Sequence, residues 1–161
     1  MADLVYFRVD SRLASILGET YSSVERALKE LVDNAWDADS TRVEIVIPEP
    51  PSTDPIVVAD NGSGMTAAEL ENEYLVVARD RRNRRGTRTQ RGRPVKGRKG
   101  IGKFAGLMVA QRMQLSATTR GETASFTLEK PQLMSSQSDL EKLPIEVVLG
   151  PAPVEHSGTR I

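Results

Sequence analysis

Residues 30–38 read Glu30-Leu31-Val32-Asp33-Asn34-Ala35-Trp36-Asp37-Ala38. This stretch lies in a longer segment, Tyr21 to Asp39, whose apolar residues recur at helical intervals. Ser22 and Glu25, near the start of the segment, have the spacing of a capping box. The segment therefore predicts a helix, whose apolar side is formed by Val24, Leu28, Leu31 and Ala35.

Three polar side chains of the predicted helix, those of Glu30, Asn34 and Asp37, fall within about 60° of arc. A solvated helix face is one interpretation of such a stripe. The residue types favour another, because an Asn oxygen can complete a Mg²⁺ shell made otherwise of phosphate oxygens and water. A Glu one turn away can orient a water for phosphoryl transfer. In that interpretation Glu30 is the base and Asn34 is the metal ligand.

A second stretch, Asp60-Asn61-Gly62-Ser63-Gly64-Met65, follows a short apolar run and precedes a helix that we expect at 67–78, capped by Thr66. A carboxylate at this position can accept a hydrogen bond from an exocyclic amine, and the glycines let the backbone approach a flat ring. An ordinary turn between a strand and a helix is the alternative, since these are common turn residues.

The third stretch runs from Lys96 to Gly106 and places glycines and cations just before a predicted helix, where exposed amide groups favour phosphate. Residues 97–103 also fit the first seven positions of a P-loop. We reject that interpretation because Phe104 stands where the Mg²⁺-binding Ser or Thr belongs. A P-loop also needs a buried strand directly upstream, whereas the residues there are basic.

The 161 residues are 39% hydrophobic and 27% charged, which suits one domain with a single core. The sequence has neither a run of about 18 apolar residues nor a basic and then apolar N-terminus. We therefore expect no membrane span, no secretory signal and a cytoplasmic location. With no cysteine and only one histidine, His156, any bound metal is expected to be a hard cation held by oxygen.

Predicted helices stand early in the sequence and predicted strands late. A third helix is expected at 102–112, and strands at 42–47, 56–59, 113–119, 124–128, 145–149 and 159–161. The residues before the first helix are expected to be irregular. This order predicts an α+β sandwich, in which helices cover one face of a mixed, mostly antiparallel sheet. Because the last predicted strand runs to the final residue, we expect the chain to be part of a longer protein.

The net charge of zero is the sum of two parts of the chain with opposite charge. Residues 79–103 hold 12 basic residues and one acidic residue. Within them, Arg79 to Lys99 is rich in Arg, Gly, Thr and Gln without apolar periodicity, which predicts a long mobile loop. A solvated loop is one interpretation of this charge. A nucleic-acid contact is another, although the loop has no aromatic residue for base stacking.

Taken together and in order, three stretches resemble the N box, G1 box and G2 box of the GHKL ATPases (gyrase, heat-shock chaperone, histidine kinase and MutL): residues 30–38, 60–65 and 100–105. A fourth, Ser157-Gly158-Thr159-Arg160-Ile161, resembles the Gly-Thr strand that closes the adenine pocket in that family. The resemblance covers residues 11–161, and it implies one domain with the Bergerat α/β sandwich fold and ATP between its helices and its sheet.

The resemblance also implies a role for each matching residue. Asp60 would bind the adenine amine, Asn34 would hold Mg²⁺, and Glu30 would act on water, with Asp37 supporting the site. Residues 79–99 would be the mobile lid that closes over ATP. The implied nucleotide-binding residues are Asn34, Asp37, Asp60, Gly62, Gly64, Met65, Lys99, Gly100, Ile101, Gly102, Lys103, Phe104 and Thr159.

Glu30 points to the hydrolytic branches, because histidine kinases usually lack this glutamate and carry a phosphoacceptor histidine upstream. The Gly-Lys-Phe-Ala sequence of the third box resembles the chaperone-like and MORC-like group. We expect slow ATP hydrolysis that drives lid closure and a conformational switch in a larger protein. The expected partners are ATP and ADP, downstream domains of the same chain, and a second copy in a nucleotide-dependent homodimer. A regulatory module that binds nucleotide without turnover and a nucleic-acid-binding domain led by the basic loop are the alternatives.

Overall fold

The computed structural model describes residues 2–6, 23–75, 86–97, 102–135 and 144–161. In this part of the chain seven strands form one sheet, in the order β1-β6-β5-β4-β7-β3-β2, and each described pairing is antiparallel. The strands are β1 (Ala2–Tyr6), β2 (Val43–Val46), β3 (Val57–Asp60), β4 (Arg112–Thr119), β5 (Glu122–Glu129), β6 (Pro144–Pro151) and β7 (Gly158–Arg160).

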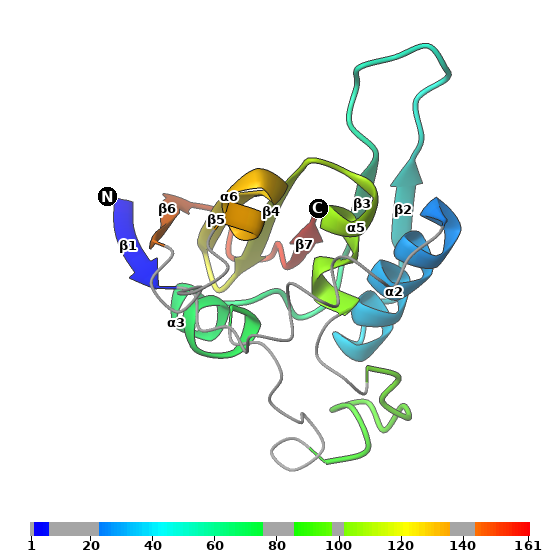
Figure 1. Ribbon diagram of the computed structural model, residues 1–161. Coiled ribbons are helices and arrows are strands. Elements are labelled where there is room, and N and C mark those ends of the chain that lie inside the picture. Colours follow the sequence, from blue (N-terminus) through cyan, green and yellow to red (C-terminus); the bar gives the residue numbers. More distant parts are fainter. Residues whose placement is uncertain (1, 7–22, 76–85, 98–101, 136–143) are drawn as a thin grey trace.

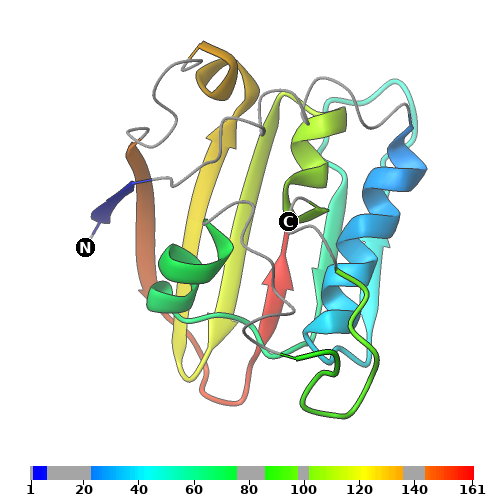
Figure 2. The ribbon, with the colours of Figure 1, turned by 60° about the horizontal axis from the view of Figure 1, so that its bottom comes forward.

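Helices cover one face of the sheet (Figure 1 and Figure 2). Among them are α2 (Val24–Asp37), α3 (Ala67–Glu69) and α5 (Ala105–Val109). The predicted α+β sandwich with a mostly antiparallel sheet is therefore confirmed. No helix among the described residues is both long enough and apolar enough to span a bilayer.

The longest strands show why the sheet has one covered face. Along β4 and β5, buried and more exposed residues alternate with the period of two that a strand imposes. Leu115 lies opposite Phe126 and Ala117 opposite Ala124, and all four are buried in the core beneath the helices. The residues between them face the open side of the sheet, where serine and threonine predominate.

Helix α2 packs through its small and aliphatic residues. Ala27 and Leu31 are buried against Val58 of β3 and Ala105 of α5. The helix begins after Ser23, whose side chain makes no capping hydrogen bond. Ser22, which we expected in a capping box, lies outside the described residues. The other side of α2 is polar, and it carries the residues of the predicted site.

Several predicted elements differ from those observed. The third predicted helix is a 3₁₀ turn, η2 (Gly102–Phe104), followed by α5, and it ends early because β4 begins at Arg112. Thr66 and Glu69 form the capping box of α3, which continues as a π-helical turn, η1 (Leu70–Tyr74), and residues 76–78 lie outside the described part. The start of the chain, predicted to be irregular, contains β1. Helix α6 (Lys130–Ser135) was not predicted.

Residues 86–97, the described part of the basic segment, form a hairpin-like turn. An antiparallel bridge joins Arg88 and Pro94, and the main chain of Thr89 accepts from Gly92 and donates to Arg93. Contacts described below hold this turn against the C-terminal half of α2. That 79–99 is a mobile lid stays a prediction, because 79–85, 98 and 99 lie outside the described residues.

Candidate functional site

The polar face of α2 meets the chain just before α5. Glu30 is half-buried, and its carboxylate lies so close to Gly102 that a Cβ on this glycine would overlap it. Residues 30 and 34 lie one above the other on a helix, so the side chain of Asn34 shares this face. The structure thus brings together Glu30, Asn34 and Gly102, three of the predicted site residues.

Asn34 has an unusual environment. Its Nδ2 is buried and has no hydrogen-bond partner in the described part of the chain. Leaving a buried amide group unpaired costs about 1–3 kcal/mol, so such groups ask for an explanation. A phosphate oxygen of a ligand held beside Asn34 could accept from Nδ2, while the neutral side-chain oxygen, Oδ1, suits a hard cation shared with phosphate.

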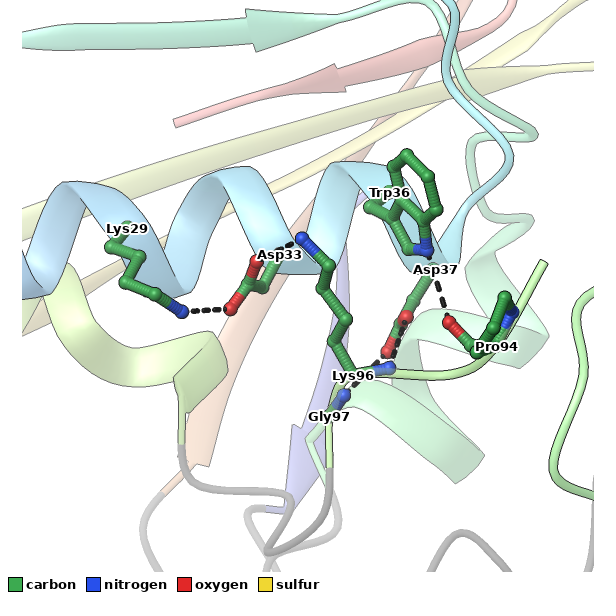
Figure 3. Close-up of polar contacts among 7 residues, drawn as sticks. All are labelled: Lys29, Asp33, Trp36, Asp37, Pro94, Lys96 and Gly97. Carbon is green, nitrogen blue, oxygen red and sulfur yellow. Dashed lines mark hydrogen bonds and ion pairs between the residues drawn. The ribbon is translucent and has the colours of Figure 1, made fainter.

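Asp37 is buried and binds the end of the basic hairpin. Its Oδ1 accepts a hydrogen bond from the Lys96 amide and its Oδ2 one from the Gly97 amide, each at 2.8 Å (Figure 3). We expected Asp37 to support the site rather than touch a nucleotide. That role stays a prediction.

Two neighbours of Asp37 were not predicted as site residues. Asp33 binds the ammonium groups of Lys29 at 2.5 Å and Lys96 at 3.0 Å. Burial alone would raise the pKa of Asp33, but these hydrogen bonds and charges outweigh it, so its pKa lies below the ordinary value. Trp36 donates from Nε1 to the Pro94 carbonyl at 3.0 Å (Figure 3). The only signal in the sequence was their position between Glu30 and Asp37.

Asp60 ends β3 on the helix-covered face of the sheet. It pairs with Thr159 of β7, and its neighbour on the same side of β3, Val58, packs under α2. Burial raises the pKa of the Asp60 carboxyl group, while backbone hydrogen bonds from Gly62 and Thr159 partly oppose the shift. The Gly62 amide donates to Asp60 Oδ1 at 2.7 Å. A partly buried carboxylate so oriented can accept from an amine group of a ligand.

The loop after Asp60 is joined to the end of α2. The Ser63 amide donates to the Ala38 carbonyl at 2.9 Å. Asn61 was not predicted to act, yet its Oδ1 accepts from the amides of Thr41 and Arg42, and its Nδ2 donates to Thr41 Oγ1. These contacts hold the predicted G1 box at the same end of α2 as Asp37.

Two other residues of this loop, Gly64 and Met65, pack against other parts of the domain. Gly64 has φ of 62°, and a Cβ there would overlap the main-chain oxygen of Thr118, so only glycine fits. Met65 is partly buried against the main core cluster. Their expected places near a bound base stay predictions.

The third predicted box is described only in part. Lys99, Gly100 and Ile101 lie outside the described residues. Lys103 donates from Nζ to the Glu73 carbonyl at 3.2 Å, and its own carbonyl accepts from the Tyr74 hydroxyl at 2.6 Å. Phe104 is fully buried in the core, edge-on to Tyr74. Any ligand contact of Phe104 would therefore come from its main chain. We expected Phe104 to bind nucleotide, and the structure limits that expectation to its backbone.

Comparisons with known proteins assign the chain to a family. The sequence model of the family described as "Histidine kinase-, DNA gyrase B-, and HSP90-like ATPase" matches residues 21–157. A putative type II restriction enzyme, HgiDII of Herpetosiphon aurantiacus, is 36% identical over 110 residues, which are 68% of this chain and 17% of that protein.

The DNA mismatch repair protein MutL also matches. The proteins of Rippkaea orientalis and Rickettsia africae are 46% and 44% identical over 55 and 54 residues, each 34% of this chain and 9% of MutL. The chain thus spans less than a fifth of each of these three relatives. They do not bear out a chaperone-like or MORC-like branch, which stays a prediction. Because the family model covers most of the chain, the protein belongs to the histidine kinase-, DNA gyrase B- and HSP90-like (GHKL) ATPases, a membership that implies ATP binding.

Proposed function

We propose that this domain binds Mg-ATP between α2 and the sheet and hydrolyses it slowly, and that turnover closes the basic segment 79–99 and switches a larger protein. The observation that carries the proposal is the buried Asn34 amide without a partner in the described residues, on the same helix face as Glu30. A generic solvated face would leave this amide in water.

The adenine base would lie beside Asp60. An exocyclic amine can donate to the carboxylate, which the sheet holds beside Thr159 on the face under the helices. Guanine presents a carbonyl oxygen at the corresponding position, and two acceptors facing each other disfavour binding. A site that loses a buried hydrogen bond discriminates strongly between ligands, so this geometry favours ATP over GTP.

The phosphates would lie toward Glu30 and Asn34. Asn34 would hold Mg²⁺, which when bound neutralises charge on the phosphate oxygens. The Glu30 carboxylate would orient a water and accept its proton as the water attacks the terminal phosphoryl group. Glu30 lies directly against Gly102, the first residue of the η2 turn that precedes α5.

The larger protein is proposed to act on DNA, since the relatives that match are named as a restriction enzyme and as mismatch repair proteins. In the described half of the basic segment, two cations take part in local contacts. Arg93 donates to the Ser40 carbonyl at 2.6 Å and Lys96 pairs with Asp33, whereas Arg88 and Arg91 are exposed.

Calorimetry with Mg-ATP and Mg-GTP tests the adenine site. We expect wild-type protein to bind ATP more tightly than GTP, and Asp60→Ala to weaken ATP binding by about tenfold or more, the loss expected for a hydrogen bond to a charged group. Asp54→Ala, in the exposed loop between β2 and β3, is the matched control and should bind like wild type. Wild-type protein without measurable affinity for ATP, or an Asp60→Ala variant with full affinity, would contradict the proposal.

Turnover is tested separately with Glu30→Gln, which keeps the shape of the side chain and removes its basicity. We expect this variant to bind ATP with near wild-type affinity and to lose most phosphate release. If it hydrolyses ATP as fast as wild type, Glu30 is not the base. If wild-type protein binds ATP without any turnover, the domain is a regulatory nucleotide-binding module.

A further inference from the structure

The strand β2 forms one end of the sheet, and its outer edge has no strand partner among the residues that the structure describes (Figure 1). Ile45, Val46 and Ile47 along this edge are 41%, 50% and 60% exposed. Natural edge strands are usually blunted by charges, prolines or bulges, whereas residues 43–47 carry a single charge, that of Glu44. We propose that two copies of this domain pair β2 with β2 in antiparallel fashion, so that their sheets join into one.

The main-chain groups that β2 offers to a second strand can be identified from its neighbour β3. Val58 of β3 exchanges two hydrogen bonds with Ile161 on its far side, at 2.8 Å and 2.9 Å. Ile45 lies opposite Val58, so its amide and carbonyl make no ladder bonds to β3 and point out of the sheet edge. By the alternation of an antiparallel ladder, Val43 points outward in the same way. A second strand at this edge can bind the main chain of both residues.

The side chains along this edge differ between the two faces of the sheet. Val43 packs against the cluster beneath α2, so Ile45 and Ile47, two and four residues further on, lie on the helix-covered side. Arg42 and Glu44 lie on the open side and form an ion pair at 3.6 Å. A second strand at this edge therefore meets aliphatic side chains on one face and a charge pair on the other.

Three positions of the two-fold axis between the copies are disfavoured. Centred on Glu44, the pairing would place two carboxylates directly opposite each other. Centred on Val43, it would need the amide of Thr41, which already donates within the chain. Centred on Val46, it would run three residues past the end of β2, into the proline-rich loop. The axis is therefore placed at Ile45.

Centred on Ile45, the edge is complementary to itself. Ile45 lies opposite its own counterpart and Val43 lies opposite Ile47 of the second copy, so aliphatic residues meet on the helix-covered side. On the open side, Glu44 lies opposite Val46 of the second copy and keeps its ion-pair partner. The contact uses none of the residues assigned to nucleotide. It needs no ATP, unlike the nucleotide-dependent homodimer expected from the family resemblance, and it does not rest on the proposed function.

Cysteine pairing tests this register, because the chain has no cysteine of its own. Glu44 and Val46 of the second copy form a non-hydrogen-bonded pair, whose Cα atoms lie about 4.5 Å apart, within reach of a disulfide. The two Glu44 residues lie diagonally, about 7–8 Å apart, which is too far. Glu44→Cys and Val46→Cys, mixed and oxidised, should therefore give on the order of tenfold more mixed dimer than either same-variant dimer by intact mass spectrometry.

Val148→Cys is the control for Val46→Cys, because Val148 of β6 is also 50% exposed but lies away from the β2 edge. Mixed with Glu44→Cys, it should give no excess of mixed dimer. The inference is overturned if Glu44→Cys links to itself as readily as to Val46→Cys, or links to Val46→Cys no better than to Val148→Cys.

Sedimentation equilibrium of the 161-residue chain without nucleotide tests the pairing without cysteines. Wild-type protein should dimerise with rising concentration, Ile45→Lys should place a charge at the two-fold axis and abolish the dimer, and Val148→Lys should keep it. A dimer that survives Ile45→Lys would place the contact elsewhere and overturn the inference. So would a wild-type monomer at about 1 mM, where a contact with a dissociation constant of about 1 mM would hold half of the chains in dimers.

Discussion

At Asp60, burial and hydrogen bonding act on one carboxyl group in opposite directions. Burial disfavours the charged form and raises the pKa, and the backbone hydrogen bonds from Gly62 and Thr159 partly offset it. The ionised form is the one that can accept from an adenine amine. Binding should therefore weaken on acidification at a higher pH than the ordinary value of 3.8 would suggest.

The first prediction follows from this shift. Because the folded pKa lies above 3.8, the folded chain binds a proton in the window just above that value while the unfolded chain has released it. The Asp60 contribution to stability is therefore lost as pH rises through the window, whereas ATP affinity is gained. We expect the ratio of wild-type to Asp60→Asn affinity to fall as pH is lowered from 7 to about 4. Calorimetry at several pH values measures it, and a constant ratio would contradict it.

Gly64 allows a second prediction at the residue scale. Gly64→Ala places a Cβ against the Thr118 main chain and strains the backbone, so we expect a loss of about 3 kcal/mol in the free energy of unfolding. Gly92 has a similar φ of 78° but open space where a Cβ would lie, so Gly92→Ala isolates the backbone strain, about 1 kcal/mol. Urea denaturation of both variants measures the two losses in the free energy of unfolding. Equal losses would show that the close contact of a Cβ with Thr118 does not matter.

At the scale of elements, α2 and the strands β2 to β7 were predictable because their apolar residues recur with the helical period of 3.6 or the strand period of 2. β1 was missed because its pairing with β6 comes from tertiary contact rather than from a local pattern. The hairpin 86–97 was missed for a related reason, since it is held by Trp36 of α2 and by Asp39 just after α2, both distant in the sequence. The predicted site residues of α2 and β3 were brought to one face, but sequence spacing cannot show which main-chain amides Asp37 and Asn61 bind.

The turn between β4 and β5 allows a prediction for an element. Arg120 and Gly121 both have positive φ, 53° and 81°, between the paired residues Thr119 and Glu122, which is the geometry of a type I′ turn. Arginine is strained there and asparagine is tolerated well. We expect Arg120→Asn to raise the free energy of unfolding by about 0.5 kcal/mol and Arg120→Val to lower it by about 1 kcal/mol. Thermal denaturation checks both, and the reverse order would contradict the turn assignment.

At the scale of the whole molecule, the two oppositely charged parts of the sequence contact each other. The basic segment and the acidic remainder of the chain meet where residues 86–97 lie on α2, so part of the charge asymmetry is neutralised in local contacts. The sheet has a helix-covered face that carries Asp60 and Thr159, and an open face. A ligand on the covered face should stabilise the entire domain. The reason is that α2 packs on β3, the strand that ends at Asp60, so both sides of the site exist only in the folded chain.

That coupling allows a prediction for the whole domain. Mg-ATP at 100 times its dissociation constant should raise the free energy of unfolding of wild-type protein by about 2.7 kcal/mol, since it binds only the folded state. The same ATP concentration should stabilise Asp60→Ala much less. Denaturation curves with and without nucleotide give both values, and an equal effect on the two proteins would place ATP away from Asp60.

The most direct measurement of where ATP binds is an NMR titration of the ¹⁵N-labelled chain with Mg²⁺ and a non-hydrolysable ATP analogue. The open face offers a competing place, a cleft of about 410 Å³ whose lining includes Ser116, Thr123 and Arg160 and also reaches Asp60 and Thr159. We predict that the amide signals of Asn34, Gly62 and Gly102 shift saturably with the analogue while those of Ser116 and Thr123, in the open-face cleft, stay unchanged. Shifts confined to the open face, or no shifts at all, would contradict an ATP site between α2 and the sheet.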